Sequence, residues 1–365
     1  RLELLGVAGI EAGTPPNSPQ EFAKVEAIAA QIRRPAIRAL ARAGVDSDID
    51  SAWNAIKGAR KPELHLFYSS SDIHQAGQLH VGKDEAIEKA AVGIKRAARY
   101  CEVQFSPMDA TRTDPDYLYL FVKEAIYAGA TIINIPDTVG YALPIEYATL
   151  ISNILDERNV PNIKKAIVGV HCHNDFGLAD ANTISGIQAG ARQAEMTING
   201  VGERAGNGAH ASVIMAILTR SKYLQDKIDV SHINTQLFGP ISRYFFGAIG
   251  WPIPYDMPMI GINAFAHESG IHGDGVIKNP LTYEIVDPKS VGWQGKRFVL
   301  GQTSGRNVFQ EVVKQYFGYE LEGGILQVAF EAFQAKVNER ELIDGDIMRI
   351  VEESLGRNYA SDQVK

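Results

Sequence analysis

Short apolar segments alternate with amphipathic helical segments along the first two-thirds of the chain. The apolar segments have the length and β-branched content of buried strands and predict strands at residues 7–12, 36–41, 63–69, 101–106, 131–136, 166–171 and 193–199. Helical patterns follow at 19–31, 46–58, 83–100, 114–128, 144–156, 178–189 and 208–221. Ser18 and Asp114 each precede a proline at the first helical position, and Gly129 lies where a helix should end. This alternation predicts βα units and a parallel sheet.

The number of units favours a closed sheet. Seven units, preceded by residues 1–5 that resemble the last turn of a helix, predict an eighth unit before the first residue. We therefore expect an α/β fold, a (β/α)8 TIM barrel whose first strand is missing from this chain. An open, doubly wound sheet is the alternative. The barrel is favoured because polar side chains collect at predicted strand ends, where barrel enzymes keep their chemistry; these are Glu11, His65, Asp109, Asp137, Thr138, His171, His173 and Glu203.

The βα alternation stops after Tyr223. A helix is predicted at 230–249 with Ser231 as its N-cap, and the prolines that follow Trp251 end it. Amphipathic helices are predicted again between 307 and 355. We expect a barrel domain at 1–222, a connecting subdomain at 223–306 that completes the site, and a small helical C-terminal subdomain at 307–365.

The composition is that of an ordinary globular protein, with 45% hydrophobic and 22% charged residues. A formal net charge of −7 argues against nucleic acid or an anionic membrane as the main partner. No apolar segment reaches the about 18 residues that a membrane span needs. Cys101 and Cys172 lie in apolar strand-like segments, which favours buried free thiols and a cytoplasmic location, or an organelle stroma in a eukaryote.

His171 and His173 are the first candidate for chemistry. They follow the apolar segment 166–170, and residues two apart on a strand point to the same face. Two imidazoles at a strand end can hold a divalent metal ion. The alternative is a hydrogen-bonded polar pair without an ion.

Two further segments carry polar groups to predicted strand ends. Residues 199–207 hold three glycines and predict a tight turn that presents Glu203 and Asn207, although a loop fixed by a Glu–Arg pair is the plainer interpretation. Asp137 and Thr138 end another strand, where the hydroxyl could bind a substrate carboxylate or carbonyl, or where Asp137 could only cap the next turn. A single histidine such as His65 is more often a satisfied core residue.

A third segment, 263–276, lies outside the predicted barrel. Its His267 and His272 are five residues apart, so they do not form the H-E-x-x-H motif of zinc proteases. His272 is a candidate general acid or base, because histidine titrates near neutral pH. The alternative is two histidines hydrogen-bonded within a glycine-rich loop.

Five sequence segments together resemble the 2-isopropylmalate synthase family. They are NIPDTVGYALP (134–144), HCHNDFGLADAN (171–182), TINGVGERAGN (197–207), NAFAHESGIHGDGV (263–276) and LGQTSGR (300–306). More broadly, the chain is similar to the acyl-CoA Claisen-condensing branch of the DRE-TIM metallolyases, which includes homocitrate and citramalate synthases. The likeness runs from Ile10 to about Asn307, most of the chain.

The resemblance implies a reaction and a metal site. Acetyl-CoA would condense with a 2-oxo acid, 2-oxoisovalerate in leucine biosynthesis, and thioester hydrolysis would release 2-isopropylmalate and CoA. His171 and His173 would be ligands to a divalent metal such as Mg, Mn or Zn, with Asn207 close to the ion. The ion would chelate the 2-oxo acid and polarise its keto group.

The resemblance also implies roles for four further residues. Thr138 would bind the carboxylate of the 2-oxo acid, and His65 would line its pocket. His272 and Tyr283 would reach into the site of a partner subunit and assist acid–base chemistry, which predicts a homodimer.

The sequence departs from the family pattern in two places. The family's first strand carries an Arg–Asp pair that would precede Arg1, and without it we expect weaker metal binding and a rate lower by on the order of 100- to 1,000-fold. Met108 follows Phe-Ser-Pro where the family has glutamate, and a thioether cannot transfer a proton. Either His272 takes over that chemistry or the activity is altered.

Two alternatives to 2-isopropylmalate synthesis follow. The 2-oxo acid could be that of a homocitrate, citramalate or methylthioalkylmalate synthase, a choice that pocket residues such as His74, Tyr141 and Leu143 would decide. The chain could also be a catalytically weakened barrel with a binding or regulatory role. A leucine-sensing domain, which many members of the family carry, is not represented before Lys365, so feedback inhibition cannot be inferred.

Overall fold

The computed structural model describes residues 1–224 and 228–356, which form two compact units that divide between Phe245 and Phe246. The first unit is built on one parallel sheet in which each strand pairs with its neighbours in sequence. Its strands are β1 (Gly9–Gly13), β2 (Ala36–Arg42), β3 (Pro62–Ser69), β4 (Glu102–Met108), β5 (Ile132–Asp137), β6 (Ile167–Cys172) and β7 (Gln193–Glu195). The predicted strand ends are correct to within one or two residues except at β7, which stops at Glu195 because Ile198–Gly200 form a 3-10 turn.

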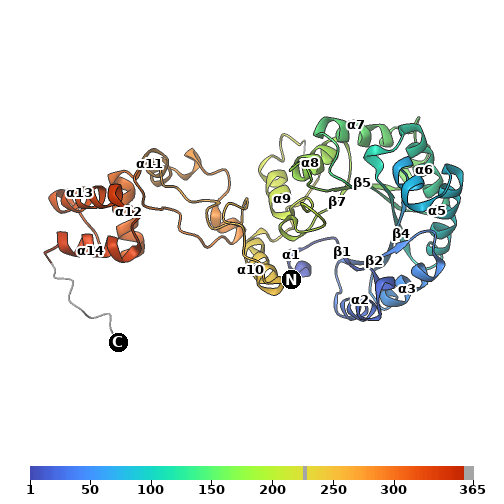
Figure 1. Cartoon of the computed structure of the whole chain (residues 1–365), viewed down its shortest axis with the longest axis horizontal. Coiled ribbons are helices and arrows are strands. Elements are labelled where there is room, and N and C mark those ends of the chain that lie inside the picture. The colour runs from blue at the N-terminus through green and yellow to red at the C-terminus, as the bar shows by residue number, and fades with distance from the viewer. Residues whose placement is uncertain (225–227, 357–365) are drawn as a thin grey trace. The chain divides into compact units, whose positions relative to one another are not determined.

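Helices cover the outside of this sheet (Figure 1). They are α2 (Pro19–Gln31), α3 (Asp46–Ile56), α5 (Lys83–Ala97), α6 (Pro115–Ala128), α7 (Pro144–Leu155), α8 (Ala179–Ala189) and α9 (His210–Thr219). Two short helices, α1 (Leu2–Leu5) and α4 (Asp72–His74), precede β1 and follow β3, and α10 (Phe238–Ile249) spans the division between the two units. The predicted caps are confirmed: the Ser18 hydroxyl accepts from Glu21 N at 3.1 Å, and the Asp114 carboxylate accepts from Tyr117 N at 3.0 Å. Gly129 ends α6 in the left-handed conformation.

The sheet is curled. Arg38 on β2 donates from Nη2 to Gln193 Oε1 on β7 at 3.0 Å, although β2 and β7 stand five positions apart in the strand order. Such a contact requires the sheet to bend until its two ends approach each other. Strands β1 and β7 are those ends. The predicted barrel architecture is therefore confirmed, and the open, doubly wound alternative is wrong.

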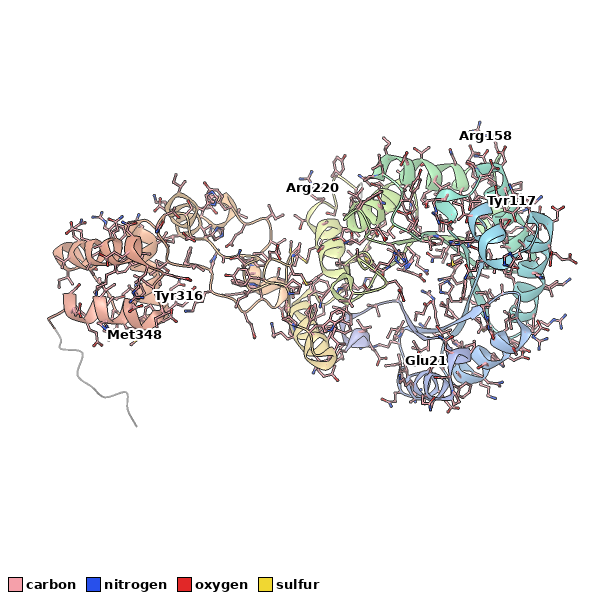
Figure 2. All side chains as sticks on the ribbon, viewed as in Figure 1. Glu21, Tyr117, Arg158, Arg220, Tyr316 and Met348 are labelled. Atoms are coloured by element: carbon pink, nitrogen blue, oxygen red, sulfur yellow. The ribbon has the colours of Figure 1, made fainter. Side chains whose placement is uncertain are left out.

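The main hydrophobic core lies between the sheet and its helices. Leu64 and Phe105 from the sheet and Ile49 and Phe121 from the helices are at most 1% exposed. Burial of each such side chain contributes about 1.5–3 kcal/mol. Figure 2 shows how densely side chains fill this unit, with Arg158 at its outer surface.

Close packing of α5 against the end of β2 depends on a glycine. A Cβ at Gly93 would lie 1.7 Å from the carbonyl oxygen of Ala43, so the helix would have to move away. We expect Gly93→Ala to lower the free energy of unfolding by about 1–3 kcal/mol. Gly247→Ala in α10 is the matched control, because its Cβ would meet nothing within 4 Å and should raise helix stability by about 0.5–1 kcal/mol. Urea titrations of both variants test this, and equal effects would contradict it.

The helix predicted at 230–249 is wrong in its first part. It begins at Phe238, after a 3-10 turn at Thr235–Leu237, and Ser231 is not its cap. Pro240 explains the start, since a proline further inside a helix would clash with the carbonyl four residues before it. Asn234 instead donates its N–H to the Leu5 carbonyl oxygen at 2.8 Å, a tertiary contact that local sequence does not reveal.

His210, the first residue of α9, gives the fold a pH dependence. Burial lowers its pKa from 6.5 to about 4, and neither ring nitrogen has a hydrogen-bond partner among the described residues. The unfolded chain therefore binds the proton more readily, so this stability is present above about pH 6.5 and is lost as the pH falls toward 4.

We expect the free energy of unfolding to fall by roughly 2 kcal/mol more in the wild type than in His210→Leu between pH 7.5 and pH 5. Urea titrations at the two pH values measure this difference. A parallel decline in the two proteins would show that His210 does not cause it.

Among the described residues of the second unit, the end of α10 is followed by α11 (Gly270–Lys278), α12 (Arg306–Phe317), α13 (Gly323–Glu339) and α14 (Asp344–Ser354). The last three confirm the amphipathic helices predicted between 307 and 355. They share a core around Phe309, Phe330 and Phe333. Within the described ranges, no helix is long and apolar enough to cross a membrane. The division into three domains stays a prediction.

Candidate active site

The two predicted metal ligands lie at the carboxyl end of β6, His171 within the strand and His173 directly after it. The ring centroids of His171 and His173 lie 5.0 Å apart, with an angle of 83° between the ring planes. The Nδ1 atom of each ring is buried and has no hydrogen-bond partner among the described residues. Buried polar atoms are usually paired, so the unpartnered Nδ1 of His173 fits a ligand site better than a self-contained polar pair. His171 Nδ1 instead lies 3.6 Å from the Glu195 carboxylate, which leaves Nε2 of that ring on the side of Asn207.

Asn207 joins the two histidines from the glycine-rich turn. Its Nδ2 lies 3.4 Å from His171 Nε2, and its backbone forms an isolated bridge with His173. The turn closes because residue 202 is glycine: a Cβ there would lie 1.9 Å from Asn207 Oδ1. The structure thus brings together all three residues predicted to hold a metal.

His173 has the protonation state that metal binding needs. Burial, followed by electrostatic interaction with His171 and Arg204, lowers its pKa to about 4. The ring is therefore neutral at physiological pH, and a neutral imidazole is the metal-binding form.

Beneath the carboxyl ends of the strands, where His171 and His173 lie, a hydrogen-bonded network crosses the barrel interior. Glu195 accepts from Gln104 Nε2 at 2.6 Å and from Asn134 Nδ2 at 2.9 Å. Asn134 Nδ2 also donates to Ser106 Oγ at 3.1 Å. Glu195 Oε2 lies 3.6 Å from His171 Nδ1, so the network ends beneath the metal-ligand candidates. We expect it to hold His171 in place, as partners behind metal ligands commonly do.

His65 is part of the same network. Its Nδ1 pairs with the Glu11 carboxylate, and its Nε2 is 2.8 Å from Ser106 Oγ. Burial alone would lower the pKa of His65, but the carboxylates of Glu11 and Glu195 outweigh it and raise that pKa. With both nitrogens engaged and 5% of the residue exposed, His65 is more a satisfied core histidine than a free pocket group.

Glu11, His65 and Glu195 also bring possible ligand atoms within 4.8 Å of one another. Their atoms are already occupied by each other and by neighbouring amides. Arg38 adds positive charge, with its Nη1 3.9 Å from Glu195 Oε1, and this disfavours a cation. His171, His173 and Asn207 are therefore the better candidate metal site.

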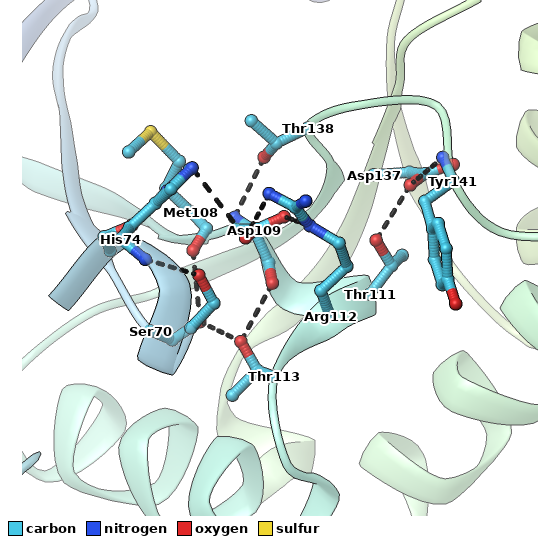
Figure 3. Close-up of polar contacts among 12 residues, drawn as sticks. Ser70, His74, Met108, Asp109, Thr111, Arg112, Thr113, Asp137, Thr138 and Tyr141 are labelled. Carbon is cyan, nitrogen blue, oxygen red and sulfur yellow. Dashed lines mark hydrogen bonds and ion pairs between the residues drawn. The ribbon is translucent and has the colours of Figure 1, made fainter. Parts of the chain in front are cut away.

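Asp137 and Thr138, at the end of β5 and the start of the next loop, make different contacts. Asp137 is fully buried and accepts from Thr111 Oγ1 at 2.8 Å and from the N–H groups of Tyr141 and Ala142 at 3.0 and 3.2 Å. This is the turn-capping role considered for it. The Thr138 hydroxyl instead accepts from the backbone N–H of Asp109 at 2.9 Å (Figure 3).

Met108 ends β4 beside Ser69 of β3 and is half-buried. The next residue, Asp109, lies just after β4 in the left-handed conformation, so the alternation of side chains along a strand does not place it. Its carboxylate is fully buried and accepts from Arg112 Nε at 2.8 Å and Nη2 at 2.9 Å. Asp109 therefore does not replace the carboxylate that position 108 lacks.

Arg204 fixes the glycine-rich turn, but its partner is not the adjacent glutamate. It donates to both carboxylate oxygens of Asp175, at 2.7 and 2.9 Å, and to the carbonyl oxygen of Thr138 at 2.8 Å. One guanidinium thus ties together the loops that follow β5, β6 and β7. The Glu–Arg pair considered from the sequence is replaced by this longer-range contact.

The two remaining predicted residues lie in the second unit. The rings of His272, on α11, and Tyr283 are stacked with centroids 4.1 Å apart. Tyr283 is 44% exposed. His272 belongs to a helix, so a hydrogen-bonded glycine-rich loop does not describe it. Beside them, Glu284 accepts from Arg297 at 2.6 and 2.7 Å and lies 3.5 Å from His267 Nε2.

Sequence reasoning missed the interior network. Its signal was present as polar residues two apart on one strand, Gln104 with Ser106 and Gln193 with Glu195. Such spacing places both side chains on one face, but it does not tell which strands share a partner.

Comparisons with known proteins agree with this geometry. A family model described as HMGL-like matches residues 1–237, and one described as homocitrate synthase post-HMGL domain-like matches residues 259–341. The 2-isopropylmalate synthases of Syntrophus aciditrophicus and Nitratidesulfovibrio vulgaris are 46% and 43% identical to the chain over 359 residues. Each alignment covers 98% of this chain and 68% of the relative.

A solved structure shares the fold. The hydroxymethylglutaryl-CoA lyase of Pseudomonas aeruginosa matches with a TM-score of 0.53 over 69% of this chain and 84% of that one. Its sequence identity is 19%, so the likeness concerns the fold alone.

Proposed function

Because the chain belongs to the 2-isopropylmalate synthase family, and is therefore an acyltransferase, we propose that it condenses acetyl-CoA with 2-oxoisovalerate. The products are 2-isopropylmalate and CoA, a reaction of leucine biosynthesis. The observation that supports this most is the cluster of His171, His173 and Asn207 at the carboxyl end of a parallel strand, in which His173 Nδ1 is buried without a hydrogen-bond partner among the described residues.

His171, His173 and Asn207 would hold a divalent ion such as Mg, Mn or Zn, which supplies Lewis-acid polarisation of a carbonyl group. Glu195 keeps His171 oriented from below. The Thr138 hydroxyl would donate a hydrogen bond to the carboxylate of the 2-oxo acid. His65 supports the pocket wall through Ser106 rather than meeting the substrate with a free nitrogen.

His272 and Tyr283 would carry the acid–base steps, supplied by the partner subunit of a homodimer. One of them removes a proton from the methyl group of acetyl-CoA, and the resulting carbanion equivalent attacks the keto carbon. The new alkoxide takes up a proton, and water then cleaves the thioester to release CoA. The stacked, solvent-facing arrangement of the two rings suits residues that act on another chain's substrate.

A substrate panel tests the proposal. The full-length protein should release CoA, measured with a thiol reagent, from acetyl-CoA and 2-oxoisovalerate, and chelation by EDTA should abolish the release until metal is restored. Faster release with 2-oxoglutarate, pyruvate or a methylthioalkyl 2-oxo acid would assign one of the alternative synthases. No release with any acid would contradict the proposal and favour the binding or regulatory role.

A further inference from the structure

We propose that Asp109 is a positioning residue that orients the Thr138 hydroxyl toward the substrate carboxylate. This inference rests on the proposed function, in which Thr138 binds that carboxylate. Asp109 itself does not touch the substrate, because it is fully buried. It acts through its backbone N–H, which lies 2.9 Å from Thr138 Oγ1.

The contact fixes the direction in which Thr138 can donate. A threonine hydroxyl has one proton and two lone pairs. The N–H of Asp109 occupies a lone pair, so the proton must point elsewhere. Within the described residues, no group accepts that proton. An ionised carboxylate is an acceptor only, so it matches the unused donor.

The conformation of Asp109 is what aims its N–H. Its backbone has a φ of 69° and a ψ of 37°, in the left-handed region that non-glycine residues rarely adopt and that asparagine and aspartate tolerate best. A strained residue of this kind persists only where its surroundings hold it, and it often marks a functional site.

Several contacts supply that hold. Arg112 binds both carboxylate oxygens of Asp109, His74 Nε2 lies 3.8 Å from one of them, and Thr113 Oγ1 donates to the Asp109 carbonyl at 2.8 Å. The carboxylate and both backbone polar groups are therefore fixed (Figure 3). A residue needed only to end β4 would not require an ion pair to a fully buried carboxylate.

Thr138 is also held from its other side. Arg204 donates to its carbonyl oxygen at 2.8 Å from the loop after β7. Its backbone is thus anchored to one loop and its hydroxyl to another. The remaining freedom, rotation of the hydroxyl proton, is the one that Asp109 restricts.

A double-mutant cycle in the full-length protein tests the inference. Thr138→Val should raise the KM for 2-oxoisovalerate on the order of 10- to 100-fold, as expected for a lost hydrogen bond to a charged group. Asp109→Ala should raise it about 10-fold, Asp109→Asn less because asparagine tolerates the left-handed conformation, and Asp109→Ala in the Thr138→Val background should add nothing. The KM for acetyl-CoA should not change.

Asp50→Ala is the matched control, because Asp50 also binds one arginine, Arg96, through both oxygens, but on the outer helices α3 and α5. It should leave the KM for the acid unchanged. If Asp109→Ala does not fold, the same cycle with Asp109→Asn, and calorimetric titration of the acid, replace it. If the double variant is active and its increase in KM equals the product of the two single increases, Asp109 does not act through Thr138. That result would overturn the positioning role and leave the proposed function intact. A wild type that releases no CoA would overturn the proposed function and this inference together.

Discussion

His171→Ala is expected to lower CoA release on the order of 100- to 1,000-fold, the cost of losing one electrostatic stabiliser of a developing charge. The ring places Nε2 beside Asn207 in the candidate metal site, and alanine provides no ligand in its place. Bound metal should fall together with the rate. Initial rates and metal analysis by mass spectrometry measure both quantities on the same sample.

His232→Ala is the control, since His232 is exposed and lies outside the metal-ligand cluster. It should keep both the rate and the metal. A His171→Ala protein that retained a tenth of the wild-type rate with its metal still bound would show that the ion is held elsewhere. Glu11, His65 and Glu195 would then be the place to look.

Phe333→Ala is expected to lower the free energy of unfolding of the helices α12 to α14 by about 3–5 kcal/mol. Phe333 is fully buried, and its ring lies 5.1 Å from that of Phe309 and 6.1 Å from that of Phe330, between centroids. A small unit has few other contacts to compensate for the cavity. Hydrogen exchange of the amides in these helices should accelerate, while exchange in the barrel strands should not.

Val328→Ala in the same helix provides the comparison. Val328 is 55% exposed, so its truncation should change stability by no more than about 0.5 kcal/mol. Equal exchange rates in the two variants would show that the three phenylalanines do not carry the stability of this unit.

The interior network shows why a site is only partly legible in a sequence. Gln104, Asn134 and Glu195 meet because the sheet curls and brings β4, β5 and β7 around one interior. Each strand alone predicts only which face its side chain takes. The partner of Arg204 was misjudged for the same reason: the adjacent Glu203 is near in sequence, whereas Asp175 is near only in the folded chain.

The sequence by itself determined what depends on neighbours along the chain. The strands and most helices, the caps at Ser18 and Asp114, and the shared face of His171 and His173 follow from periods of two and 3.6 residues and from local hydrogen bonds. Thr138 and His65 were candidates because they lie at predicted strand ends, and the resemblance to a family gave them their specific roles. The tertiary structure alone decided that both ring nitrogens of His65 contact Glu11 and Ser106, and that α10 starts at Phe238. It also decided that the backbone N–H of Asp109 donates to the Thr138 hydroxyl. These depend on contacts between distant segments, which form only when the sheet curls and the loops at its carboxyl end converge.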